Sequence, residues 1–179
     1  MILRNTIRGS LLVLPRYDLP NAAPPPLREV QLLLNSQDLE NEVDWLPDWL
    51  AERGLVRAER RARALRAALR ALVRANNGTP LDDDAVATVN AAAARRVAVQ
   101  VDASGTVRVA TDGDTLDQVV AVALGAMLDG SWGRLKACRH CRWTFYDRSP
   151  NRSGTWCSMQ LCGNRTKTRA YRKRRSAAS

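Results

Sequence analysis

The chain has 179 residues, of which 45% are hydrophobic and 26% are charged. That length suits one ordinary domain, or one domain with a small module, and the composition excludes a chain that is disordered throughout. The longest apolar stretch, residues 119–128, is too short to cross a bilayer, and the apolar run at 11–14 is too short for a secretory signal. We therefore expect a cytoplasmic protein with no membrane partner.

The formal net charge of +10 is unevenly distributed. Residues 134–175 contain thirteen Lys and Arg and one acidic residue, whereas the rest of the chain contains fifteen basic and seventeen acidic residues. Arg outnumbers Lys by 25 to 3. A GC-rich genome would produce that preference, but it would not remove acidic residues from one end of the chain. A near-neutral body with a strongly basic end is typical of nucleic-acid-binding proteins.

The first part of the chain predicts a short irregular segment followed by helices. Six of the eight prolines lie at or before Pro47, so residues 1–28 are expected to form an irregular lead-in. The apolar run at 30–34 fits either a buried strand or a helix. Asp44 predicts the cap of a short helix over residues 45–53, with Gly54 as its stop. Apolar residues spaced by three and four over 55–72 then predict an amphipathic helix that ends at 76–78.

The remaining faces of this amphipathic helix carry seven arginines. Arg is a good helix former, and arginines on a helix surface are more often solvated than bound to DNA. We therefore expect the seven side chains to face solvent. They are Arg57, Arg60, Arg61, Arg63, Arg66, Arg70 and Arg74.

A further helix, a hairpin and another helix are predicted next. Thr79 and Pro80 predict a helix start, and the acidic run 82–84 suits the positive end of that helix better than a metal site. The alternating residues at 97–101 and 106–109 predict a β-hairpin with one buried face. Asp114, followed three residues later by Asp117, predicts the start of a helix whose apolar side spans 116–127.

The four cysteines are the clearest chemical signal. Cys138 and Cys141 are separated by two residues, Cys157 and Cys162 by four, and the spacer between the pairs has fifteen residues. This spacing suits one tetrahedral Zn²⁺ held by four thiolates, which is structural because no coordination position stays open. Disulfides are disfavoured in a reducing compartment, and iron–sulfur clusters use tighter cysteine runs. So short a segment has little core, so the metal would supply much of its folding free energy.

His140 is the only histidine in the chain and lies between the first two cysteines. With four thiolates available, we expect it to be a bystander, or a hydrogen-bond donor to a phosphate or a thiolate, rather than a metal ligand. A lone histidine cannot form a His-based catalytic pair within one chain, and no nucleophile motif accompanies it. We therefore expect no enzymatic activity.

The residues around the cysteines resemble the CGNR zinc-finger family of bacterial proteins. Residues 162–165 read Cys-Gly-Asn-Arg, residues 156–159 read Trp-Cys-Ser-Met, and an aromatic stretch at 143–146 lies in register with them. In that family the finger follows an N-terminal domain called ABATE. The marker of that domain is represented here by residues 32–36, with Ser36 where Thr is usual and without the acidic residue that usually precedes it.

The resemblance implies a stress-induced transcription regulator whose finger binds DNA and whose N-terminal domain senses a ligand or a stress. It also makes Asn35, within the marker, a candidate ligand-binding residue. Motifs and resemblance together predict an α+β protein: a lead-in over 1–28, a helix-dominated ABATE-like domain with a β-hairpin over 29–131, and a four-cysteine zinc finger over 132–176. The finger is expected to consist of a knuckle, a strand with a turn, and a basic helix.

Basic residues around the predicted metal define a candidate nucleic-acid surface. Arg165, Arg169 and Arg172 would share one face of a helix that starts at the second cysteine pair. Such side chains neutralise phosphates, and one or two of them would reach guanine edges. The candidate contacts are Arg139, Arg142, Arg148, Arg152, Arg165, Lys167, Arg169, Arg172 and Lys173.

Three neighbouring features have structural interpretations. We expect Asn164 to cap the helix rather than to read an adenine. We expect Gly163 to permit a close approach of the backbone or an unusual backbone dihedral near the metal, rather than to contact DNA. The aromatic residues 143, 145 and 146 are expected to pack around the metal, since stacking on bases would instead favour single-stranded nucleic acid.

The favoured partner is duplex DNA, and the favoured function is regulation of transcription. An RNA-binding module and a zinc-dependent protein-interaction adaptor remain as alternatives. A small-molecule effector and a second copy of the chain are further candidate partners, although no heptad or other dimerisation signal is visible.

Overall fold

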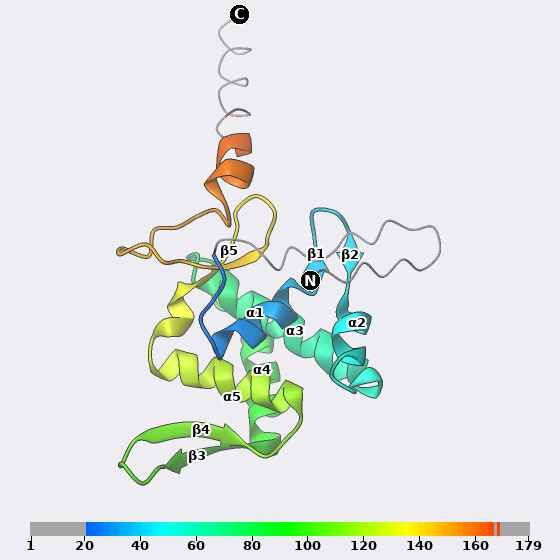
Figure 1. The fold of residues 1–179 in the computed structure, drawn as a ribbon, viewed down its shortest axis with the longest axis vertical. Helices are drawn as coiled ribbons and strands as arrows, with labels where there is room; N and C mark the ends of the chain where they lie inside the picture. The colour runs from blue at the N-terminus through cyan, green and yellow to red at the C-terminus, as the bar shows by residue number, and fades with distance from the viewer. Residues whose placement is uncertain (1–20, 167, 169–179) are drawn as a thin grey trace, which may run out of the picture.

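The computed structural model describes residues 21–166 and 168, and it shows a helix-rich α+β fold with small antiparallel sheets. Figure 1 shows the last helical turn at one end of the long axis and a β-hairpin at the other end. The elements are α1 (Leu27–Asn35), β1 (Gln37–Asp38), β2 (Val43–Asp44), α2 (Leu46–Ala51), η1 (Val56–Ala58), α3 (Glu59–Ala75), α4 (Asp83–Arg96), β3 (Val97–Val101), β4 (Val107–Thr111), α5 (Thr115–Leu128), η2 (Ser131–Arg134), β5 (Leu135–Ala137), β6 (Thr144–Tyr146) and η3 (Met159–Gly163).

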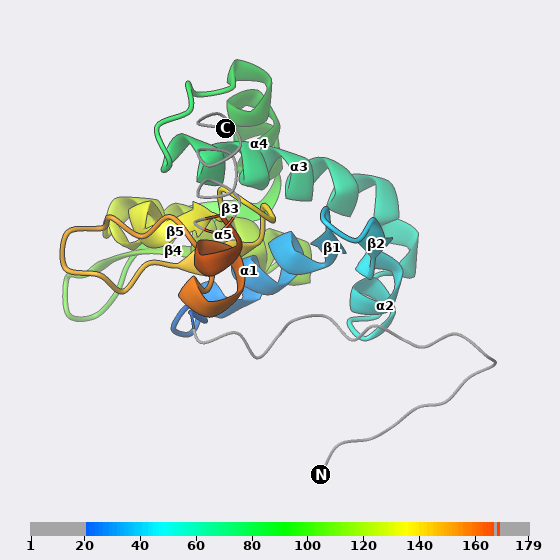
Figure 2. The ribbon, with the colours of Figure 1, turned by 90° about the horizontal axis from the view of Figure 1, so that it is seen from above.

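Helices α1, α3, α4 and α5 form the body, which we define as residues 21–131. Helix α3 packs against α4 and α1, and α5 packs against α1 and α4. Figure 2 shows α3 and α4 on one side of α1 and α5. Leu33, Leu69 and Leu116 are completely or almost completely buried between these helices. The apolar run at 30–34 is therefore part of a helix, and α1 begins inside the segment predicted as an irregular lead-in.

Two arginines of α3 contradict the prediction that its arginines face solvent. Arg66 is 4% exposed, and its Nη1 donates to Asp44 Oδ1 at 2.7 Å and to Ser36 Oγ at 2.8 Å. Arg70 donates from Nε to the carbonyl oxygen of Leu34 at 2.9 Å, and burial lowers its pKa to about 10. These two side chains therefore join α3 to the segment between α1 and α2. Arg61 is half-buried in an ion pair with Asp114. The arginines that are exposed as expected are Arg57 of η1 and Arg60, Arg63 and Arg74 of α3.

Side-chain caps correct one helix boundary and confirm another. Helix α4 begins at Asp83 and not after Thr79, because Asp82 Oδ1 accepts from the N–H of Ala85 at 3.0 Å. The acidic run 82–84 lies at the helix N-terminus, as predicted. Asp114 and Asp117 cap α5 reciprocally, each carboxylate accepting from the backbone N–H of the other, which confirms the predicted helix start.

The hairpin β3–β4 is confirmed, with Val99 paired to Val109 and Val101 to Val107. The prediction of one buried face is wrong for its outer half. Val99, Val101 and Val107 are 69%, 68% and 57% exposed. The cause is visible in Figure 1, where the hairpin extends beyond the helices, so α5 covers only the end near the body. Within the described residues, no helix combines the length and apolar character needed to cross a membrane.

Asp44 provides a test of the buried link between α3 and the preceding segment. Burial raises the pKa of Asp44, but hydrogen bonds from Arg66, from the N–H of Leu46 and from Arg63 outweigh it and hold the pKa well below the usual 3.8. Because the folded-state pKa is depressed, this stabilisation is fully present above about pH 4 and is lost as the pH falls below that value.

Asp44→Asn should lower the free energy of unfolding at pH 7 by about 1–3 kcal/mol, because the buried Arg66 loses its charged partner. The difference from wild type should shrink between pH 4 and lower pH in urea unfolding curves. Asp112→Asn is the matched control, since Asp112 is an exposed carboxylate with a long 3.5 Å contact to Arg96. A difference between wild type and Asp44→Asn that stays constant with pH would contradict the assignment.

Candidate metal centre

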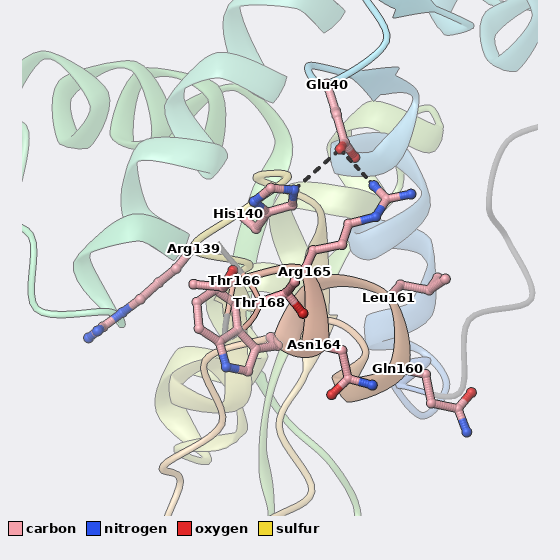
Figure 3. A pocket seen from close by; sticks show the side chains of 10 residues that line it. Glu40, Arg139, His140, Gln160, Leu161, Asn164, Arg165, Thr166 and Thr168 are labelled. Atoms are coloured by element: carbon pink, nitrogen blue, oxygen red, sulfur yellow. Dashed lines mark hydrogen bonds and ion pairs between the residues drawn. The ribbon is translucent and has the colours of Figure 1, made fainter. Parts of the chain in front are cut away.

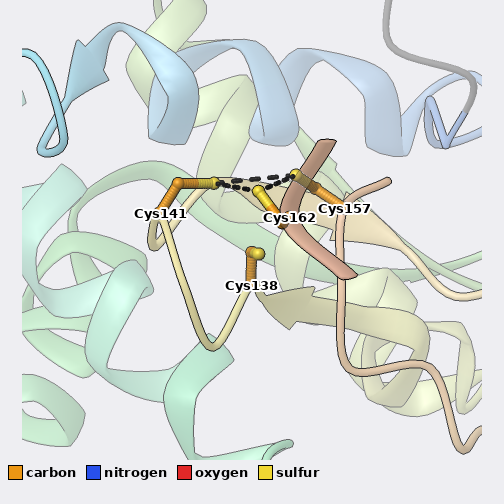
Figure 4. A group of neighbouring side chains, drawn as sticks. All are labelled: Cys138, Cys141, Cys157 and Cys162. Atoms are coloured by element: carbon orange, nitrogen blue, oxygen red, sulfur yellow. Dashed lines mark hydrogen bonds between the residues drawn. The ribbon is translucent and has the colours of Figure 1, made fainter. Parts of the chain in front are cut away.

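The four cysteines come together at one point in the finger, which we define as residues 132–168. Their sulfur atoms all lie within 4.8 Å of one another, and each residue is at most 3% exposed. Figure 4 shows the four side chains converging from two loops. Cys138 and Cys141 come from the loop between β5 and β6, and Cys157 and Cys162 come from the segment that enters and forms η3.

The first pair is held by a tight knuckle, residues 138–142. The N–H of Cys138 donates to the carbonyl oxygen of Trp143 at 2.9 Å, and the N–H of Arg142 donates to the carbonyl oxygen of Cys138 at 3.0 Å. Arg142 closes this turn with a φ of 62°, in the left-handed region. The turn directs both sulfur atoms to the same side, which is the geometry that a Cys-x2-Cys pair needs for one ion.

The second pair is held by the helical turn η3, which Ser158 caps at its N-terminus. Ser158 Oγ accepts from the N–H of Leu161 at 3.3 Å, and the Ser158 carbonyl oxygen accepts from the N–H of Cys162 at 3.0 Å. Ser158 is therefore the cap, and the prediction that Asn164 caps the helix is wrong, because Asn164 already has helical backbone angles. A Cβ atom on Gly163 would lie 2.8 Å from Met159 Sδ, so the side chain of Met159 packs closely against this glycine.

The donor set fits a soft divalent cation. Tetrahedral Zn²⁺ with bonds of about 2.3 Å separates its sulfur ligands by about 3.8 Å. Cys141 to Cys157 and Cys157 to Cys162 are each 3.6 Å apart. Hydrogen bonds from Cys141 and Cys157 lower the pKa of Cys138, and the bond to Cys138 raises the pKa of Cys141 to about 12. Four thiolates therefore require a cation to coexist at this spacing.

A small apolar cluster surrounds the sulfur atoms and is separate from the core of the body. It contains Trp143 and Phe145 from the finger, and Trp45, which comes from the body. Trp143 and Phe145 are 3% and 2% exposed, so their faces are used in packing, as predicted. Tyr146 instead packs against the core of the body, and the guanidinium of Arg148 lies 5.4 Å from its ring centre.

Two asparagines of the body bind the outer edges of the finger hairpin. Because the N–H of Cys138 donates across the hairpin to the carbonyl oxygen of Trp143, the next pair, Ala137 and Thr144, directs its backbone groups outward. Asn35 accepts from the N–H of Thr144 at 2.9 Å and donates to its carbonyl oxygen at 2.8 Å. Asn77 does the same for Ala137, at 2.9 and 3.1 Å. Each amide therefore replaces a missing neighbouring strand.

Further groups of the body complete these edges. Asn76 donates to the carbonyl oxygen of Leu135 at 2.9 Å, Gln31 donates to that of Thr144 at 3.0 Å, and the carbonyl oxygen of Asn21 accepts from the N–H of Tyr146 at 2.8 Å. The sequence pattern indicated only a helix stop at 76–78 and so missed this role. Asn35 is 3% exposed and both its polar atoms are used, so its place in the fold is structural, and binding of a ligand there stays a prediction.

Asp147 is the only acidic residue of the basic segment, and the turn 147–154 is built around it. Its Oδ1 accepts from the N–H of Ser149 at 3.0 Å, its Oδ2 accepts from the N–H of Gly154 at 2.7 Å, and Lys136 Nζ lies 3.1 Å away. Burial raises the pKa of Asp147, but these hydrogen bonds and the lysine lower it to about 2. One acid within a basic segment was the sequence signal that could have revealed this role.

The structure places five of the nine candidate nucleic-acid contacts, and all five are exposed. Arg139 and Arg142 lie on the knuckle, Arg148 and Arg152 on the turn, and Arg165 on the helical turn after η3. Arg139 and Arg165 line one groove, whereas the other three do not. Lys167, Arg169, Arg172 and Lys173 lie outside the described residues.

A helical body joined to a four-cysteine finger defines the class of this protein, and comparison with family models gives the family. The CGNR zinc-finger model matches residues 134–175. The ABATE model, described as "Putative stress-induced transcription regulator", matches residues 25–131. The chain belongs to the ABATE family and carries a CGNR zinc finger, in the order that the sequence motifs predicted. No curated protein matches the chain.

Cys157→Ser should abolish tight metal binding, because a structural site needs all four thiolates. Metal analysis of the reduced protein should fall from about one zinc per chain to a small fraction of that value. Far-UV circular dichroism should keep most of its helical signal, since the body has its own core. Serine at any of the other three cysteines is the matched comparison and should give the same loss. Retention of stoichiometric metal by one of the four variants would remove that cysteine from the ligand set.

Asn35→Ala should destabilise the joint between body and finger by about 1–3 kcal/mol, because it leaves the N–H of Thr144 buried without a partner. Thermal unfolding and the rate of zinc transfer to a chelator would both report the loss. Asn90→Ala is the control, because Asn90 is exposed on α4 and alanine is a better helix former. Equal behaviour of the two variants would show that the amide contact contributes nothing.

Proposed function

We propose that this protein is a DNA-binding transcription regulator, in which the finger contacts duplex DNA and the body senses a ligand or a partner. The observation that carries the proposal is the set of exposed arginines around a buried four-sulfur site, at the end of the chain where thirteen basic residues accompany one acid. The family assignment supports a transcription regulator in general terms, and we propose in addition that the finger contacts DNA.

A structural zinc ion would be held by Cys138, Cys141, Cys157 and Cys162, and it would brace the knuckle against η3. The contacts to DNA would be made by side chains of the protein and not by the metal ion. The arginines on the knuckle, the turn and the last helix would neutralise backbone phosphates and release counterions. Both matching families are regulatory or zinc-finger families, so we propose a function without catalysis.

Duplex DNA suits this surface better than single-stranded nucleic acid. Proteins that bind single strands stack bases on exposed aromatic rings. Trp143 and Phe145 are buried in the cluster around the sulfur atoms, so neither offers a face for stacking. Trp156 is half-buried and packs against the same cluster, so its ring is partly used in packing as well. Backbone contacts by arginine and hydroxyl groups need no such rings, and they are the usual majority of contacts to a duplex.

The body is the proposed sensor because it holds the finger directly. Helix α1 carries Gln31 and Asn35, which both bind the backbone of Thr144. Any ligand or partner that shifted α1 would therefore act on strand β6 and, through it, on the knuckle. We propose this contact as the route by which the body affects the finger.

Arg142→Ala should weaken binding of a selected duplex about two- to tenfold and make the slope of log K against log[salt] shallower by about 1, without loss of zinc. The duplex is first selected from a random pool with the purified full chain, and affinity is then measured by fluorescence anisotropy. Arg60→Ala is the matched control, since Arg60 is an exposed arginine on α3. Unchanged affinity in Arg142→Ala would move the interface away from the knuckle.

The same assay separates the alternatives. A regulator should bind the selected duplex far better than random duplex at moderate salt. Stronger competition by single-stranded RNA would favour an RNA-binding module. Binding without any sequence preference would favour an adaptor for an acidic protein partner.

A further inference from the structure

A groove of about 790 Å³ lies between the knuckle and the last helical turn of the finger. Its lining includes Arg139 and His140 from the knuckle, Trp156, and Gln160 and Arg165 from the second metal segment. One acidic side chain, Glu40, also lies in this lining, and it belongs to the body rather than to the finger. Figure 3 shows His140 and Arg165 pointing toward Glu40 from two sides, whereas Arg139 extends away from it.

Glu40 makes direct contacts with both finger residues. Its Oε1 lies 3.2 Å from Arg165 Nη1 and 3.5 Å from His140 Nε2. Glu40 occupies the short loop between β1 and β2, and its side chain is 25% exposed. Asp38 fixes this loop, because its Oδ1 accepts from the N–H of Glu40 at 2.9 Å and from that of Asn41 at 3.1 Å. The carboxylate is thus held against the finger by an ordered turn.

A carboxylate and a phosphodiester offer the same kind of oxygen acceptor to arginine and histidine donors. Arg165 and His140 therefore form a place where the protein already binds one anion. The remaining donors of the groove, Gln160 and Arg139, could add contacts to the sugar–phosphate backbone beside it. Glu40 is the internal anion, and a bound duplex would supply an external one.

We propose that Arg165 and His140 form a binding site for a backbone phosphate of duplex DNA, and that Glu40 occupies this site when DNA is absent. This inference rests on the proposed function and deepens it. DNA binding then requires displacement of the carboxylate, so Glu40 lowers the affinity of the finger for any duplex. Because Glu40 belongs to the body, a movement of the β1–β2 loop would change DNA affinity without touching the metal site.

The test compares Glu40→Gln with Glu42→Gln in the full-length protein. Glu42 is exposed in the same loop, so its replacement changes the formal charge equally. Glu40→Gln should bind the selected duplex about two- to fivefold more tightly at low salt, since an exposed ion pair of this size is being released. Its slope of log K against log[salt] should be steeper by about 1, because one more cation is free to meet a phosphate. Glu42→Gln should match wild type in both measurements.

A second pair of variants places the effect at Arg165. Arg165→Ala alone should weaken binding. Glu40→Gln added to Arg165→Ala should give a smaller gain than it gives in the wild-type background, because His140 is then the one remaining donor for which Glu40 and a phosphate compete. Zinc content and urea unfolding curves of every variant check that the finger is intact. These readouts separate loss of the phosphate site from loss of the fold.

The outcomes distinguish this inference from the proposed function. If wild type binds the duplex and Glu40→Gln behaves like Glu42→Gln, the phosphate site is overturned and the DNA-binding function stands. The phosphate site is likewise overturned if Glu40→Gln increases affinity as much in the Arg165→Ala background as in the wild-type background. If wild type and all variants fail to bind duplex even at low salt, the function and the inference fall together. Recovery of duplexes from the random pool by Glu40→Gln, where wild type recovers none, would support the inference in its strongest form.

Discussion

The backbone of the hairpin β5–β6, whose strands have three residues each, is satisfied on both outer edges by side chains of the helical body, and the position of the finger depends on this contact. A two-stranded hairpin is marginally stable alone, and bare edges invite pairing with other chains. Asn35 and Asn77 remove both problems by binding the outward groups of Thr144 and Ala137. The four-sulfur site at the end of the hairpin therefore has a fixed position relative to α1 and α3. A ligand that moved these helices would move the hairpin and the site with them.

Three ion pairs in the described part of the chain differ in burial and so differ in what they do. The Asp44–Arg66 and Asp147–Lys136 pairs each include a side chain at most 5% exposed, and each carboxylate also accepts backbone N–H groups. Such pairs are costly to break and fix local geometry. Glu40 and Arg165 are 25% and 59% exposed, so their pair contributes little stability and exchanges readily. Only the exposed pair suits a contact that must open when another anion arrives.

Local chemistry made much of this structure predictable from the sequence. Cysteine spacing predicted the sulfur cluster, because two residues are what a tight knuckle needs, and the Asp114–Asp117 pair predicted the start of α5 because both caps are local. The errors concern contacts across the chain. The sequence around Arg66 is that of a solvated helix arginine, and only the packed structure shows that it binds Asp44. The sequence around Asn77 likewise indicates only a helix stop, and the structure shows that it binds the backbone of β5. Amide side chains carry no periodicity, so their partners cannot be read from spacing.

The contacts between body and finger also determine how a change in the body reaches the finger. Helix α1 ends at Asn35, which binds the finger, and the chain then continues within five residues to Glu40, which faces Arg165. One short segment of the body thus touches the finger twice, once through a buried neutral amide and once through an exposed charge. A displacement of α1 that left the first contact intact would still move the loop that carries the second, because Arg70 of α3 donates both to the carbonyl oxygen of Leu34 in α1 and to Gln37 in β1, where the loop begins. The buried contact of Asn35 with Thr144 then keeps the finger in place. The exposed pair of Glu40 with Arg165 can open or close, which changes the net positive charge that the finger presents. The affinity for a polyanion can therefore change without unfolding of the metal site.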